Sequence, residues 1–251
     1  MPISKPFHRS CRPFTDGSYH LKGYLLDRRF AHDPQHYVRA FLLVQRDFLE
    51  LFDYIEPADV NSGVYSHRIQ QLLMRTCVEV EANLTAILIE NGYKQKENLN
   101  MRDYKKIDKT HHLSSYKVRL PGWRGSKNVR TPFAGWKIEP GSLSWYEAYN
   151  KSKHDRHKSF HLATFEALID AIVGLVVLIS AQFLDEDYSP MLKSRGLSRN
   201  YSYDTDDEMD SALGGYFRIK YPMDWDESEK YEFTWETLNA TDPNPFDKHF
   251  S

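Results

Sequence analysis

The run Ala171-Ile-Val-Gly-Leu-Val-Val-Leu-Ile-Ser-Ala-Gln-Phe-Leu184 is the longest uncharged stretch of this 251-residue chain. Its fourteen residues fall short of the roughly 20 that a transmembrane helix needs. On a helical wheel it is apolar nearly all round, and a helix with no polar face must be covered on every side. The run therefore predicts the central helix of a bundle, as part of an apolar helix over 163–184.

Two amphipathic helices are expected before this run. Asp33-Pro34 is a typical helix start, with Asp as the N-cap and Pro at the first helical position. Apolar residues then recur at spacings of three and four, which predicts a helix that ends near Glu56. The same spacing resumes after Ser62 and continues to Asn91-Gly92, a pair that often ends a helix. We expect this second helix to be one of the two long helices of the bundle.

The helical segments fall into two blocks, 34–92 and 143–185. In the second block, Ser144 and Glu147 have the spacing of a capping box, which predicts a helix start. Together the blocks predict the bundle core of a single domain that spans 1–251.

The charges of the chain are unevenly distributed. Residues 92–142 contain twelve Lys and Arg against four Asp and Glu, so we describe 93–142 as a basic insert. From residue 185 to the end there are sixteen Asp and Glu against seven Lys and Arg, so 186–251 is an acidic extension. Such an asymmetry indicates two surfaces with different partners. The acidic extension either covers the basic surface or keeps the chain soluble.

Short β segments are expected outside the bundle. Alternating or β-branched residues predict strands at 116–120 and 133–138 in the insert. The acidic extension has strand-like runs at 216–221 and 231–236, which we expect to pair with each other in antiparallel fashion. A short strand or hairpin is expected in 1–33. The predicted fold class is mainly α, with small peripheral antiparallel β segments at the termini and in the insert.

The cysteines and the N-terminus indicate the class of protein. Cys11 and Cys77 are the two cysteines, and they form neither a disulfide framework nor a paired zinc spacing. Cys77 lies inside a helical pattern, so we expect a small core residue. The first residues contain no apolar signal segment. We expect a cytoplasmic protein that is not embedded in a membrane.

Aromatic and basic residues alternate in the insert. Trp123 and Trp136 are interleaved with Arg124, Lys127 and Arg130. In a nucleic-acid surface, cations contact phosphates while aromatic rings stack on unpaired bases. The insert therefore predicts RNA contact. The alternative is a long ordered connection whose tryptophans pack onto the bundle.

The densest polar cluster is Asn150-Lys-Ser-Lys-His-Asp-Arg-His-Lys-Ser-Phe-His161, directly before the apolar helix. It contains three of the chain's eleven histidines, four cations and one carboxylate. If it were one continuous helix, Asn150 and the three histidines His154, His157 and His161 would form a single stripe. A helix start or kink near residues 154–156 would instead let an arginine and His161 reach one pocket.

Three kinds of site fit this cluster. A metal site could use His157 and His161, which are four residues apart, but Lys158 stands where a HExxH site has Glu. Metal-free RNA cleavage needs a base, an acid and a cation for the charged phosphorane. His161 with Arg156 could supply these functions, with His157 or His154 as the second proton carrier. The third interpretation is a solvated helix boundary with no catalytic role.

The segment Arg156-His-Lys-Ser-Phe-His161 resembles the signature of HEPN-domain proteins. That signature is Arg, then four to six residues, then His, with Asn, Asp or His preferred directly after Arg. The preceding Asn150-Lys-Ser-Lys-His154 also resembles the Asn-x-x-Lys-His segment of HEPN-like proteins in bacterial defence and toxin systems. The resemblance covers about 35–92 and 143–185 and leaves the insert and the termini outside.

The resemblance implies a fold, an activity and a set of residue roles. The fold is an up-down helical bundle, usually a homodimer in which two motif-bearing helices face each other across a cleft. The activity is metal-independent endoribonuclease cleavage in a toxin–antitoxin or phage-defence system. By this resemblance Arg156 stabilises the phosphate, His161 acts as acid or base, and His157 supports them.

We therefore expect a metal-independent endoribonuclease of the HEPN type that has no metal or other cofactor. Its expected partners are RNA, a second copy of the chain, and an antitoxin or other protein. Asn150, Lys153 and His154 are predicted supporting residues, and Lys158 joins the predicted RNA contacts of the insert. Glu79, in the second helix, either lies on a solvated face or faces a polar pocket, in which case it is a further predicted supporting residue. The alternative function is a non-catalytic module that binds RNA or a protein, and a metal hydrolase is a third candidate.

Overall fold

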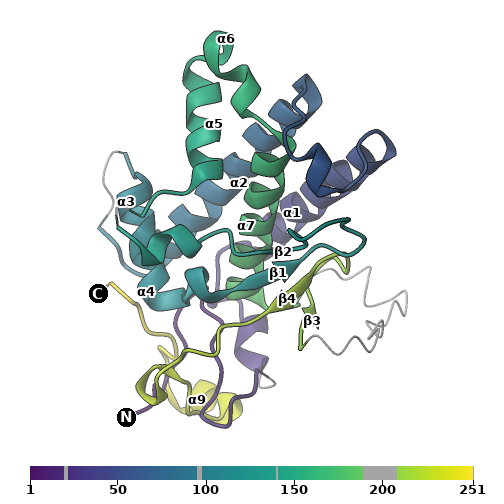
Figure 1. Ribbon diagram of the computed structural model, residues 1–251. Helices are drawn as coiled ribbons and strands as arrows, with labels where there is room; N and C mark the ends of the chain where they lie inside the picture. The colour runs from purple at the N-terminus through teal and green to yellow at the C-terminus, as the bar shows by residue number, and fades with distance from the viewer. Residues whose placement is uncertain (20–21, 95–97, 140, 189–207, 251) are drawn as a thin grey trace.

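The computed structural model describes residues 1–19, 22–94, 98–139, 141–188 and 208–250. The helix α7 (Phe165–Phe183) runs through the middle of the molecule (Figure 1). Every residue from Ala171 to Leu184 is buried, as the uncharged run predicts. By length and composition α7 could cross a membrane, but 89% of its apolar window is buried inside the protein. It is therefore the core helix of this fold.

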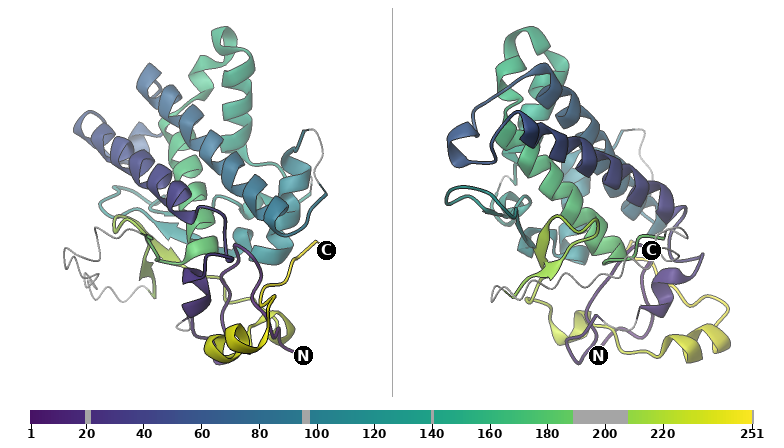
Figure 2. Two further views of the ribbon diagram at one scale, coloured as in Figure 1. Left: turned by 180° about the vertical axis from the view of Figure 1, so that it is seen from behind. Right: turned by 90° about the vertical axis from the view of Figure 1, so that its right-hand side faces the viewer.

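Three other helices cover α7. These are α1 (Pro34–Leu49), α2 (His67–Glu90) and α5 (Ser144–His154), and each of them packs against α7. Viewed from behind, α1 and α2 lie in front of α7 (Figure 2). The mainly α class and the helical core are confirmed.

Short helices make up much of the remaining chain. The α-helical turns are α3 (Met101–Tyr104), α4 (Asp108–His111), α6 (Arg156–Ser159) and α9 (Trp235–Thr241). The 3-10 turns are η1 (Gly23–Leu26), η2 (Glu50–Asp53), η3 (Asp59–Asn61), η4 (Lys105–Ile107), η5 (Leu113–Ser115), η6 (Ala134–Lys137), η7 (Phe160–Leu162) and η8 (Glu227–Glu229). The N-terminus lies at the end of the molecule opposite to α6 (Figures 1 and 2).

A small antiparallel sheet packs beside the bundle. Its strands are β1 (Lys117–Arg119), β2 (Val129–Arg130), β3 (Asp210–Ser211) and β4 (Arg218–Lys220), in the order β2-β1-β4-β3 within the described residues. Val118 of β1 pairs with Ile219 of β4, and both side chains are fully buried. The sheet thus joins the insert to the acidic extension.

The acidic extension folds differently from the sequence-based expectation. The runs 216–221 and 231–236 do not pair with each other, because β4 is taken by β1 and β3. Tyr231 instead forms isolated bridges with Ile3 and Phe14 of the N-terminal segment. Its buried ring packs edge-on against Phe14. The alternation in 231–236 therefore reflects packing against the N-terminus. The start of the acidic run 204–210 lies outside the described residues.

Two other β predictions were wrong. The run 133–138 forms the turn η6, because the buried rings of Phe133 and Trp136 pack against each other with their centroids 4.7 Å apart. In the described part of 1–33, the chain forms isolated bridges and η1 rather than a hairpin.

The predicted helix starts lie close to the observed ones, but their caps differ. Ser66, rather than Ser62, caps α2, where its hydroxyl accepts a hydrogen bond from a backbone N–H of the first turn. Asp33 precedes α1 without capping it through its side chain. The capping box at Ser144 is absent, because Leu143 occupies the N-cap position.

A buried arginine ties the N-terminal segment to the bundle. Arg9 is fully buried, and its Nε lies 2.6 Å from Glu90 Oε1 at the end of α2. Its Nη1 donates to Gln182 Oε1 on α7 at 3.0 Å, and its Nη2 donates to the His32 carbonyl at 2.6 Å. Gln182 in turn donates to Asn83 on α2 at 2.9 Å. These hydrogen bonds satisfy polar groups that the core would otherwise leave unpaired.

Replacing Arg9 should therefore destabilise the fold. Arg9→Met would remove the donor to Glu90 Oε1 and to Gln182 Oε1, so we expect the free energy of unfolding to fall by about 3 kcal/mol. Urea denaturation followed by circular dichroism measures this change. The matched control is Arg124→Ala, which removes an exposed ion pair with Glu56 and should cost less than about 1 kcal/mol. Equal losses in the two variants would contradict the assignment.

Candidate functional site

The predicted catalytic stretch forms a turn at one end of the bundle. The helix α5 ends at His154, and the chain continues through α6 and η7 before entering α7. The break occurs at Asp155, whose carboxylate accepts a hydrogen bond from Lys158 N at 3.3 Å. A short polar side chain at an N-cap favours a new helix start. We call residues 155–162 the tip, which lies at the top of the molecule in Figure 1.

The tip carries all three predicted catalytic side chains. Arg156, His157 and His161 are exposed, and none of their side chains forms a hydrogen bond or ion pair with another described residue. The continuous helical stripe is not formed, because the chain breaks at Asp155 and starts again. The alternative that the sequence allowed, a kink near residues 154–156, is present between α5 and α6. It places Arg156 and His157 on α6 and His161 on the following turn η7, at the surface.

The predicted supporting residues of α5 adjoin the tip. Asn150 is half-buried on α5, and His154 is exposed at its end. Lys153 Nζ donates to Tyr149 Oη at 3.0 Å, which raises the pKa of Lys153. These three residues lie on the last turns of the helix that leads into the tip.

Glu79 lies elsewhere. Burial raises the pKa of its carboxyl group, and the nearby charges of His36 and Arg75 oppose that shift. Twelve residues, or about 18 Å of helix, separate Glu79 from the start of α2 at His67. Its charged neighbours are His36 on α1 and Arg75 on α2. Glu79 therefore lies too far along α2 to support the tip, and that prediction is incorrect.

Trp123 of the basic insert packs inside the protein rather than on its surface. Trp123 is buried against Phe165, and its Nε1 donates to Asp59 Oδ1 at 2.6 Å. The same carboxylate accepts from Ser126 N at 2.7 Å. Gly125 is required there, because a Cβ at this position would lie 2.3 Å from Asp59 Oδ2. The ring of Trp123 is therefore a packing element, and its predicted role in stacking on RNA bases is incorrect.

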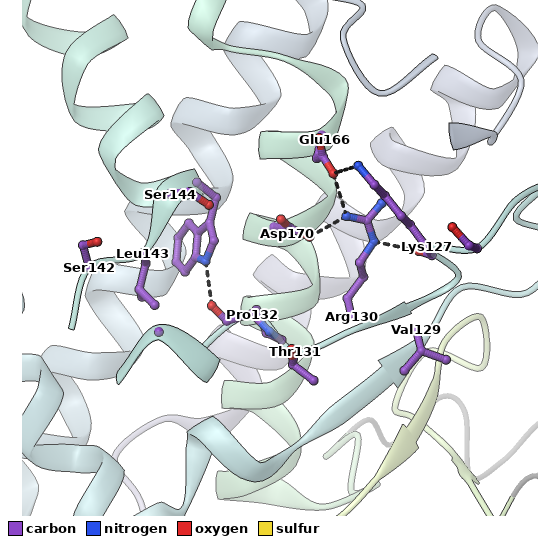
Figure 3. Close-up of a pocket in the computed structure, with 13 residues that line it drawn as sticks. Lys127, Val129, Arg130, Thr131, Pro132, Ser142, Leu143, Ser144, Glu166 and Asp170 are labelled. Carbon is purple, nitrogen blue, oxygen red and sulfur yellow. Dashed lines mark hydrogen bonds and ion pairs between the residues drawn. The ribbon is translucent and has the colours of Figure 1, made fainter. Parts of the chain in front are cut away.

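The predicted insert cations are paired with carboxylates. Lys127 lies 2.7 Å from Glu166, and Arg130 lies 3.2 Å from both Glu166 and Asp170 (Figure 3). Arg124 is exposed but is paired with Glu56 at 2.9 Å. The sequence does not reveal these pairs, because the carboxylates of α7 are remote from the insert along the chain. By contrast, Lys158 remains exposed on the tip.

A hollow between β2, α5 and α7 is lined by the paired side chains of Lys127, Arg130, Glu166 and Asp170. Its volume is about 520 Å³. An adjoining hollow of about 500 Å³ runs between α5 and α7 as far as Lys151 and Leu162, at the base of the tip. Both contain Glu166 and Asp170. Burial raises the pKa of Asp170 to about 6, against the opposing charge of Arg130.

Two residues that the sequence analysis missed lie against the tip. The ring of His67 lies 4.7 Å from that of Phe160, and the ring of Tyr65 lies 5.7 Å from it on an edge. Both come from the segment before and at the start of α2. More than ninety residues separate them from Phe160, so no local sequence pattern could have indicated the contact.

Comparisons with protein-family models, curated proteins and solved structures found no match to this chain. Among the described residues, His, Cys, Asp and Glu side chains do not gather in threes that could hold a metal ion. The residues of the tip and its surroundings are the candidate functional site.

The raised pKa of Asp170 predicts a pH dependence of stability. The folded protein holds this proton more tightly than the unfolded chain, whose pKa is near 3.8. The resulting stabilisation is fully present below about pH 4 and is lost as the pH rises through about 6. This loss amounts to up to about 2–3 kcal/mol in the free energy of unfolding, and Asp170→Asn should abolish it. Urea denaturation between about pH 4.5 and 7 measures it.

The control for this profile is Glu139→Gln. Glu139 is exposed and its pKa is lowered by a hydrogen bond with Lys105, so this variant should keep the decline of the unaltered protein. An unchanged decline in Asp170→Asn would show that another group is responsible.

Proposed function

We propose that this protein is a metal-independent endoribonuclease of the HEPN type, with Arg156 and His161 at its reaction centre. The observation that carries the proposal is that the side chains of Arg156, His157 and His161, on the consecutive turns α6 and η7, are exposed and have no hydrogen-bond or ion-pair partner among the described residues. The buried Arg9, by contrast, is engaged by Glu90. Exposed cations and imidazoles can meet a polyanion directly.

The chemistry needs a proton acceptor, a proton donor and positive charge. A base takes the proton of the ribose 2′-hydroxyl, the 2′-oxygen bonds to phosphorus, and the bond to the 5′-oxygen breaks as an acid protonates it. The products are a 2′,3′-cyclic phosphate and a 5′-hydroxyl end. His161 and His157 supply the two proton carriers, and Arg156 stabilises the charged phosphorane.

The surroundings of the tip favour a phosphate-bearing substrate. Lys151, Lys153 and Lys158 are exposed beside the motif. The one carboxylate of the tip, Asp155, accepts the hydrogen bond that starts α6. Lys151 is 4.0 Å from Glu147, at the limit of an ion pair. A net positive surface of this kind raises the local concentration of RNA.

The HEPN-type assembly is part of the proposal. A site on the surface of one copy becomes a cleft when the tips of two copies face each other, so we propose a homodimer. We further propose that the protein acts in a toxin or phage-defence system, in which an antitoxin or other protein covers the tip. The helical core around α7 and the motif at its N-terminal end are consistent with a HEPN-like bundle.

The second candidate function is a non-catalytic module that binds RNA or a protein. The exposure of residues 155–158 and of His161 favours it, because a surface open to water can bind phosphates without supporting proton transfer. RNA binding that weakens with salt, without cleavage in any condition, would support this module.

The first test is cleavage of total RNA by the purified protein in EDTA. We expect fragments with 2′,3′-cyclic phosphate ends, and a loss of at least about 100-fold in rate for His161→Ala and Arg156→Ala, because each removes a reacting group. His36→Ala is the matched control, since His36 is an exposed histidine at the start of α1. Equal activity of His161→Ala and the unaltered protein would contradict the assignment. Activity that is lost in EDTA would instead favour a metal hydrolase.

A further inference from the structure

Aromatic side chains from the tip and from the segment before and at the start of α2 together form a platform. We define it as Tyr65, His67 and Phe160. The ring of Phe160 contacts both of the others, and His161 follows Phe160 in the chain. Tyr65 is 50% exposed, and His67 is exposed at the first position of α2. Large aromatic side chains on a surface usually mark a binding site when they gather in one patch.

The platform is held rigidly. Phe165 N donates to the carbonyl of Val64 at 2.7 Å, and Glu166 N donates to the carbonyl of Ser62 at 3.0 Å. Tyr65 also forms an antiparallel bridge with Thr164. These backbone contacts fix the segment before α2 onto the N-terminal end of α7. The backbone that carries Tyr65 therefore does not need to be ordered when a ligand binds, which lowers the entropic cost of binding.

The charge around the platform favours a nucleic acid over an apolar partner. The guanidinium of Arg68 lies 5.9 Å from the ring of Tyr54, which is 76% exposed. Arg156 and Lys158 lie on the adjoining tip. Exposed rings bordered by cations match a single strand of nucleic acid, whose bases stack while its phosphates meet the charges.

We propose that Tyr65 and His67 stack one unpaired base of an RNA strand whose neighbouring phosphate lies at Arg156 and His161. This inference rests on the proposed function and adds to it a base-stacking subsite beside the reaction centre. A base inside a duplex has no free face, so the platform selects loops, bulges and ends. Every base has a π face, so the platform tolerates different base identities.

The experiment measures RNA affinity without cleavage. A fluorescent unstructured oligoribonucleotide is titrated in EDTA with the His161→Ala protein and with the same protein carrying a second change. Tyr65→Ala should weaken binding roughly ten-fold, whereas Tyr65→Phe should retain the affinity, because the ring is kept. Met223→Ala is the control, since Met223 is 82% exposed and lies outside the platform.

Two further readouts separate stacking from a structural effect. The salt dependence of binding should be unchanged in Tyr65→Ala, which removes no charge, but shallower by about 0.7 in Arg156→Ala. In a second set of oligoribonucleotides, each lacks the base at one position. Removing the base at one particular position should weaken binding to the protein that keeps Tyr65, but should not weaken binding to Tyr65→Ala. Thermal melting checks that each variant is folded.

The outcomes distinguish this inference from the proposed function. Cleavage by the unaltered protein, together with equal RNA affinities of Tyr65→Ala and its parent, overturns the platform alone. RNA binding that Tyr65→Ala weakens, with no cleavage by the unaltered protein, supports the platform and overturns the proposed nuclease. Neither cleavage nor RNA binding by the unaltered protein overturns both. A change of oligomeric state in Tyr65→Ala, with RNA affinity intact, would show that the surface is an interface between copies and would overturn the inference.

Discussion

The burial of α7 is the constraint on which the rest of the structure depends. Its residues from Ala171 onward offer water no polar face, and each fully buried Leu, Ile or Val adds about 1.5–3 kcal/mol to stability. Such a helix is stable only when other elements surround it, so α1, α2 and α5 pack against it. The two polar residues near its end, Ser180 and Gln182, are buried as well. Gln182 is accommodated because Arg9 and Asn83 complete its hydrogen bonds.

The charged residues of α7 lie in its first six positions. Glu166 and Asp170 emerge where the helix approaches the surface, and they engage Lys127 and Arg130 from the insert. The insert is thereby fixed against the bundle through its charges as well as through its buried tryptophans. Positive charge that is counted along the insert is therefore partly neutralised by carboxylates from other segments, as at Arg124, Lys127 and Arg130. Positive charge on the tip is not, because Asp155 is the one carboxylate within that turn.

The tip and its neighbours owe their arrangement to the N-terminal end of α7. The chain must leave α5, reverse, and enter α7, and the break at Asp155 provides that reversal. The segment before α2 is hydrogen-bonded to the same end of α7. Tyr65 and His67 thus meet Phe160 beside the proposed reaction centre. A core helix whose end organises a surface site combines rigidity with access for a large substrate.

The sequence by itself determined the helical core and the location of the polar turn. The uncharged run and the spacing of apolar residues depend on local periodicity, which is visible in any window of the chain. Only the tertiary structure decided which cations are free and which rings are exposed. Trp123 and Tyr231 look like a stacking residue and a strand residue in sequence, but their neighbours Asp59 and Phe14 come from distant segments. Which ions pair, which rings are buried and which side chains meet depends on segments that come together only when α7 is covered. The ring contacts of the platform could therefore not be predicted from either of its two segments alone.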